Sequence, residues 1–278
     1  MTSTAAASIE LRHTDTVVTI APQRGAIVTS MRILDRELLY MDEATLNDPS
    51  KNVRGGIPVL FPTPGKLDDD RWHFIGRGGE LKQHGFARTL PWQIADRSAA
   101  ETDRVRLTLE SSPTTLDAYP WQFSASLTYS VRPSTLRIEF DVTNRDMTPM
   151  PFALGFHPYF HVDDKARATI ATPASRAFDN LAKTVVPFNG FDFTRGEVDL
   201  HLLDHGSACA ALALADRTIA IDCAPQFSRW VVWSLPGKPF ICLEPWTAPG
   251  NALNSGEHLI LLAPGRSQQL FVEIAAHA

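Results

Sequence analysis

A histidine stands inside an apolar and aromatic run, ALGFHPYF, over residues 153–160. An imidazole titrates close to neutral pH, so the side chain of His157 is suited to proton transfer. The same pattern is compatible with a core histidine that is hydrogen-bonded to a backbone carbonyl. His157 is therefore a candidate acid or base with a structural alternative.

A glutamate follows a short apolar run in FICLEPWTAPGNALN, residues 240–254. We expect a buried strand that Pro245 terminates, with Glu244 at its end. A carboxylate there is costly unless it is paired, hydrogen-bonded or protonated, and partial burial would raise its pKa toward the range of a general base. The alternative is a strand-end charge that faces water. Trp246 either packs in the core or offers a flat apolar surface to a sugar ring.

An arginine precedes two glycines in NVRGGIPVLFPTPG, residues 52–65. Glycine permits close approaches and dihedral angles that other residues avoid, so Arg54 could point into a cleft. Its guanidinium would donate forked hydrogen bonds to sugar hydroxyls or to a phosphate. The alternative is a surface loop that leads into a core strand.

Polar groups also gather in KQHGFARTLPW, residues 82–92, where Gln83, His84 and Arg88 lie within six positions. A histidine beside a glycine is often a turn residue. Three hydrogen-bonding groups on one loop favour a binding role, because binding residues concentrate on loops.

The elements that must position these residues are strands. Apolar and polar residues alternate through residues 121–144, which predicts a hairpin with one buried and one exposed face. The stretches RVRLTLES, CAALALADRTIAIDC and RWVVWSL continue the pattern, whereas helical periodicity is weak. We therefore expect an all-β chain with a single antiparallel domain over residues 1–278, as a large sandwich or barrel.

Composition excludes several classes of function. The net charge is -5, which does not suit nucleic acid or an anionic membrane as a partner. Three cysteines without a CxxC pair predict reduced thiols in a cytoplasmic protein and no cysteine zinc site. The N-terminus lacks the features of a signal peptide, and no apolar run is long enough to cross a membrane.

Nearly the whole chain resembles the aldose 1-epimerases, or galactose mutarotase-like proteins. The resemblance rests on segments that occur in the family's order, namely APQRGAIVTSM, RGGIPVLFP, QHGFAR, GFHPYF, CLEPWTAPGNALN and LAPG. The resemblance implies a large antiparallel β sandwich whose concave face holds a sugar. It implies that Glu244 is the general base, that His157 is the general acid and that His84 binds substrate. An aspartate should also contact the sugar, with Asp199 as the best match and Asp192 and Asp204 nearby.

The chemistry implied is interconversion of the α and β anomers of an aldohexose. A carboxylate and an imidazolium on opposite sides of the anomeric centre would take a proton from the C1 hydroxyl and give one to the ring oxygen. The ring opens, the aldehyde turns and the ring closes on its other face. We expect no cofactor, no metal and no covalent intermediate, and the partner is a small-molecule sugar.

Other functions remain open. A related branch acts on hexose 6-phosphates, where residues in the contexts of Arg54, Arg88 and Gln83 are associated with the phosphate. A non-catalytic carbohydrate-binding protein is a second alternative, although both Glu244 and His157 are present. A glycosidase would need two carboxylates at a set separation, and only one is strongly placed.

Overall fold

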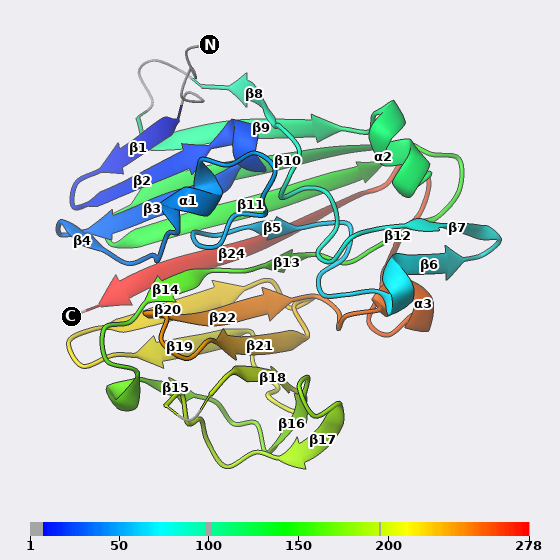
Figure 1. The fold of residues 1–278 in the computed structure, drawn as a ribbon. Coiled ribbons are helices and arrows are strands. Elements are labelled where there is room, and N and C mark those ends of the chain that lie inside the picture. The colour runs from blue at the N-terminus through cyan, green and yellow to red at the C-terminus, as the bar shows by residue number, and fades with distance from the viewer. Residues whose placement is uncertain (1–7, 98–101, 195, 278) are drawn as a thin grey trace.

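Two eight-stranded antiparallel sheets form most of the molecule in the computed structural model (Figure 1). The structure describes residues 8–97, 102–194 and 196–277. The first sheet has the order β15 (Thr169–Ala171), β19 (Cys209–Ala213), β20 (Thr218–Cys223), β24 (Ser267–His277), β11 (Thr135–Asn144), β10 (Phe123–Arg132), β9 (Arg104–Glu110) and β8 (Gln93–Asp96). The predicted antiparallel β sandwich is confirmed.

The second sheet carries the segments that the sequence singled out. Its order is β17 (Thr184–Pro187), β16 (Arg176–Asp179), β18 (Val198–Leu202), β21 (Arg229–Ser234), β22 (Phe240–Trp246), β13 (Gly155–Phe156) and β5 (Val59–Leu60). Strand β14 (Tyr159–His161) also pairs with β22. The stretches around His157 and Glu244 are therefore neighbours in one sheet.

Smaller elements complete the described fold. A four-stranded sheet contains β1 (Ile9–His13), β2 (Thr16–Ala21), β3 (Ile27–Ile33) and β4 (Arg36–Glu37), and two-stranded ladders join β12 (Met150–Phe152) to β23 (Ile260–Leu262) and β6 (Arg71–Phe74) to β7 (Arg77–Glu80). The helices are α1 (Glu43–Leu46), α2 (Pro113–Ala118) and α3 (Ala252–Ser255), with 3-10 turns η1 (Pro22–Arg24), η2 (Asp68–Asp70) and η3 (Lys165–Arg167). No helix of the described residues is long and apolar enough to span a bilayer.

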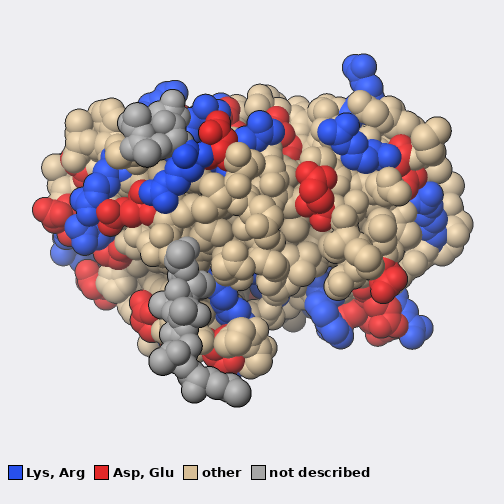
Figure 2. Space-filling view, turned by 90° about the horizontal axis from the view of Figure 1, so that it is seen from above, with Lys and Arg blue, Asp and Glu red and all other residues tan. Residues whose placement is uncertain are grey.

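The alternation in the sequence decides which side chains form the core. Strands β10 and β11 pair along their whole length, as predicted, so that Leu127 lies opposite Phe140. Both are buried in the same apolar cluster as Ile241 and Leu243 of β22, which places the core between the two large sheets. Because side chains alternate between faces, Cys242 and Glu244 project from the other face of β22. Lys and Arg are interspersed with Asp and Glu on the surface seen in Figure 2.

The prediction that Pro245 ends its strand is wrong, because β22 continues to Trp246. A proline lacks the N–H that a central strand donates, so it is tolerated where the ladder is interrupted. Two neighbouring strands pair with β22 on the same side. Gly155 of β13 lies opposite Trp246, and β14 begins to pair where Tyr159 lies opposite Cys242. The ladder on this side of β22 is therefore interrupted from Leu243 to Pro245, and His157 lies in the break between β13 and β14.

Candidate active site

A cleft of about 680 Å³ lies over the second sheet, on the face opposite the core. Six of the seven side chains predicted for the site line it, namely Arg54, Gln83, His84, His157, Asp199 and Glu244. They come from segments spread over most of the chain, and the pairing of strands brings them together.

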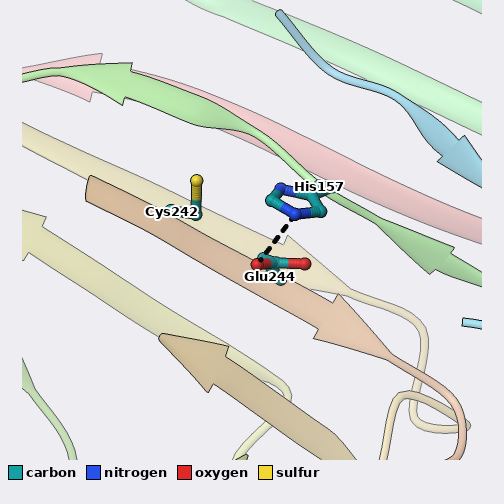
Figure 3. Close-up of side chains that lie close together, drawn as sticks. All are labelled: His157, Cys242 and Glu244. Carbon is teal, nitrogen blue, oxygen red and sulfur yellow. Dashed lines mark ion pairs between the residues drawn. The ribbon is translucent and has the colours of Figure 1, made fainter. Parts of the chain in front are cut away.

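Glu244 and His157 form a close pair in this cleft (Figure 3). The carboxylate Oε1 lies 3.4 Å from the imidazole Nε2, and both side chains are almost completely buried. The other carboxylate oxygen, Oε2, accepts a hydrogen bond from the indole N–H of Trp246 at 3.0 Å. The expected arrangement, with the anomeric carbon between acid and base, is not observed, because a gap of 3.4 Å leaves no room for that carbon. Both groups instead face the cleft from the same side.

Burial favours the neutral form of each partner. It raises the pKa of Glu244 well above its usual value, and the negative charge of Asp199 acts in the same direction, whereas the Trp246 hydrogen bond opposes it. Burial also lowers the pKa of His157 to about 3, helped by the positive charges of Arg88 and Arg54. Burial therefore disfavours the imidazolium and carboxylate that the sequence led us to expect.

The imidazole of His157 is held by aromatic rings and by the backbone. It stacks on Tyr159 with ring centroids 4.6 Å apart and meets Trp233 edge-on at 5.7 Å. Its backbone N–H donates to the carbonyl of Pro58, which joins this segment to the loop that carries Arg54. Its Nδ1 is buried without a hydrogen-bond partner among the described residues, so the structural alternative of a carbonyl-bonded core histidine is not what the structure has.

The tautomer of His84 is set by its neighbours. Its Nδ1 accepts a hydrogen bond from the backbone N–H of Gly65 at 3.0 Å, and the backbone N–H of His84 donates to the carbonyl of the same glycine. Burial and the nearby charges of His157, Arg88 and Arg54 lower the pKa of His84 well below its usual value. The neutral ring therefore carries its proton on Nε2, where it is a hydrogen-bond donor.

A row of cross-strand neighbours defines the floor of the cleft. His201 of β18 lies opposite Val231 of β21, and Val231 lies opposite Glu244 of β22. Adjacent strands are about 4.8 Å apart, so the backbones at His201 and Glu244 are separated by roughly 10 Å. The indole of Trp246 packs against Val231 in this row and meets the His201 ring edge-on at 5.3 Å.

Asp199 lies beside His201 on β18 and also lines the cleft. Its Oδ1 is 3.5 Å from His201 Nε2, and its Oδ2 accepts a hydrogen bond from the Asn180 amide at 2.7 Å. Burial opposes ionisation of Asp199, but the hydrogen bonds from His201 and Asn180 outweigh it and lower its pKa. Asp192 and Asp204, the two other aspartates considered, are not among the residues that line the cleft.

The two arginines have different positions. Arg54 lines the cleft with its guanidinium 5.7 Å from the ring centre of Trp233. Arg88 does not line it; its guanidinium is largely buried and donates to the backbone carbonyl of Gln83. In this structure Arg88 supports the loop that carries Gln83 and His84.

The sequence analysis missed several residues that line the cleft, His201, Asn180, Lys183, Glu197 and Trp233 among them. One of them had a readable signal, because His201 follows Asp199 by two positions in a strand and so shares its face. Lys183 and Asn180 come from a turn whose position depends on strand pairing alone, and no local pattern identified them.

One cluster of the described residues has the donor types of a metal site. The donor atoms of His157, Cys242 and Glu244 lie within 4.8 Å of one another (Figure 3). A metal would bind the thiolate and the carboxylate. Burial raises the pKa of Cys242, with the charge of Glu244 acting in the same direction, so the thiol is protonated. The cluster as it stands is better suited to moving a proton than to holding a cation.

The pair of Glu244 and His157 and its cleft lie on an antiparallel β sandwich, the fold of galactose mutarotase-like proteins. The aldose 1-epimerase family model matches residues 7–275, and the chain belongs to that family. The Slr1438 protein from Synechocystis has a similar structure, with 34% identity and a TM-score of 0.95 over 99% of this chain and 97% of that one. A galactose mutarotase-like protein from Lactobacillus casei has 25% identity and a TM-score of 0.80 over 98% and 100% of the two chains. A curated Salmonella typhimurium protein, named "Putative glucose-6-phosphate 1-epimerase", is 26% identical over 85% of this chain and 81% of its own length.

Proposed function

We propose that the protein is an isomerase that interconverts the α and β anomers of an aldohexose. The observation that carries the proposal is the pair of Glu244 and His157, 3.4 Å apart and facing an open cleft. The hydroxyl on C1 and the ring oxygen are bonded to the same carbon. Two proton-transfer groups on one side of the cleft can therefore reach both oxygens at once.

A single proton on the pair is sufficient for the whole reaction. With Glu244 charged and His157 protonated, the carboxylate takes the C1 hydroxyl proton while the imidazolium protonates the ring oxygen, and the C1–O5 bond breaks. The pair then holds its proton on Glu244. After the aldehyde turns about the C1–C2 bond, His157 removes the proton from the O5 hydroxyl, Glu244 protonates the carbonyl oxygen, and the ring closes on the other face.

The remaining cleft residues bind and orient the sugar in this proposal. The Nε2–H of His84 donates to a sugar oxygen near the reacting carbon. Asp199 and His201, two strands away from Glu244, contact other hydroxyls of the sugar. Arg54 and Gln83 provide further donors at the edge of the cleft. A fixed ring orientation is needed because acid and base act only within hydrogen-bond reach.

Polarimetry tests the proposal most directly. We expect the protein to accelerate optical relaxation of freshly dissolved α-glucose and α-galactose well above the buffer rate. Relaxation at the buffer rate for both sugars would contradict the function. It would favour the non-catalytic carbohydrate-binding alternative, which equilibrium binding of the same sugars would then test.

The pH dependence follows from the shared proton. A second proton binds His157 below about pH 3, which removes the base, and the shared proton leaves when Glu244 ionises at its raised pKa, which removes the acid. We therefore expect kcat/KM to persist through pH 4–6, below the usual histidine pKa of about 6.5. An acid limb near pH 6.5 would contradict this assignment. Background-corrected polarimetry across pH provides the measurement.

A hexose 6-phosphate is the second candidate substrate. Arg54, Lys66 and Lys183 line the cleft and would attract a phosphate, although Asp68, Asp69 and Glu197 line it as well. The name of the Salmonella relative favours the same substrate class.

Exchange NMR on glucose 6-phosphate, run beside polarimetry on glucose, separates the two candidates. We expect fast exchange of the free sugar and little effect on the ester. Acceleration of the ester alone would make the hexose 6-phosphate the favoured substrate. In that case Arg54→Gln should lower kcat/KM for the ester by about tenfold or more, because charge-assisted bonds to phosphate are strong, and Arg132→Gln, an exposed arginine at the end of β10, should not.

A further inference from the structure

Trp246 contacts the proposed base in a specific way. It stands two positions after Glu244 on the same face of β22, and its indole Nε1 donates to Glu244 Oε2 at 3.0 Å. The other oxygen, Oε1, faces His157. The two carboxylate oxygens thus have different partners, one that only donates and one that can exchange a proton.

The indole has little freedom to leave this position. Trp246 is 4% exposed. If Gly155 carried a Cβ atom, that atom would lie only 2.8 Å from the indole Cδ1, so the ring packs directly against the glycine. A Cβ at Gly65 would lie 3.2 Å from its Cζ3, so glycines on two sides leave the space that the ring fills. The rings of His84 and His201 meet it edge-on at 5.8 and 5.3 Å. The N–H is therefore directed at the carboxylate by the packing of the whole cleft.

We propose that Trp246 is a positioning residue whose indole N–H holds the Glu244 carboxylate and favours its charged form. This inference rests on the proposed function. A hydrogen bond from a neutral donor is stronger to a carboxylate than to a carboxylic acid. The bond therefore shifts the shared proton from Glu244 toward His157. The form with a charged Glu244 and a protonated His157 is the one that opens the ring in the proposed mechanism.

The Trp246→Phe variant keeps an aromatic ring and removes the N–H. Without the bond the charged carboxylate is rarer, so kcat at neutral pH should fall by about tenfold. The same loss raises the pKa of Glu244, so the alkaline limb of the rate profile should move up by about one pH unit. A variant that is slower at neutral pH yet remains active to higher pH is not expected from a loss of packing alone.

Trp230→Phe is the matched control. Trp230 is buried outside the cleft, and its indole N–H donates to the backbone carbonyl of Ser207 at 3.0 Å. Because this bond does not reach Glu244, we expect the alkaline limb of this variant to stay in place. In a Glu244→Gln background, Trp246→Phe should have almost no further effect on the residual rate, since the charge that the N–H stabilises is gone.

A titration that does not depend on activity completes the test. The carboxyl carbon of Glu244 is followed by NMR in protein labelled with ¹³C-glutamate and assigned by its absence in Glu244→Gln, with Trp246→Leu as a second variant if Trp246→Phe does not fold. We expect a higher Glu244 pKa in the variant than in the wild type. An unchanged pKa would overturn the role of Trp246, whereas a raised pKa in a protein that accelerates no sugar would support the hydrogen bond and overturn the proposed function.

Discussion

Glu244→Gln is expected to lower kcat for anomer interconversion by about 10²–10⁴-fold, the usual contribution of one acid–base group. The amide has nearly the shape of the carboxyl group, but it cannot take up the proton from the C1 hydroxyl. Burial raises the pKa of Glu244, so an uncharged amide suits this buried position. The substitution should therefore leave the folding stability close to that of the wild type, and polarimetry and thermal unfolding measure the two effects.

Glu110→Gln provides the control for this variant. Glu110 is an exposed residue of β9 in the other large sheet and accepts a hydrogen bond from Ser124. The Glu110→Gln substitution should leave kcat unchanged. If folded Glu244→Gln kept the wild-type rate, the carboxylate would have no part in proton transfer and the proposed mechanism would be wrong.

His157→Gln is expected to have an effect of similar size. The side-chain amide is close in length to the imidazole and is polar, but it neither gives nor takes a proton at Nε2. In the proposed mechanism Glu244 and His157 share one proton, so removal of either partner stops the same step. The Glu244→Gln/His157→Gln double variant should then be no slower than the slower single variant, as is typical of groups that act as a unit.

His73→Gln, at an exposed position of β6, is the matched control for a histidine outside the cleft, and its rate should equal that of the wild type. Multiplicative losses in the double variant would contradict the shared proton and would show that the two residues act in separate steps. Single-turnover NMR exchange measures rates slow enough to compare all three variants.

The strands and most of the candidate residues could be predicted from local patterns in the sequence. Period-two alternation requires one dry and one wet face, which is why the hairpin of β10 and β11 could be predicted with its turn. Glu244 and His157 stood out because each is a titratable group inside an apolar run, a placement that is costly without a partner. His201 could have been found by the same alternation from Asp199.

The way in which these residues meet depends on contacts between segments that are distant in the sequence. The 3.4 Å separation of Glu244 and His157 depends on the pairing of β22 with β13 and β14, which joins segments far apart in the chain. The continuation of β22 through Pro245 depends on a break in the neighbouring strand, which no local pattern reports. The low pKa of His157 and the raised pKa of Glu244 come from burial, and burial exists only once the sheets have packed. The charge that each group carries therefore depends on the fold, because packing decides how far each side chain is removed from water.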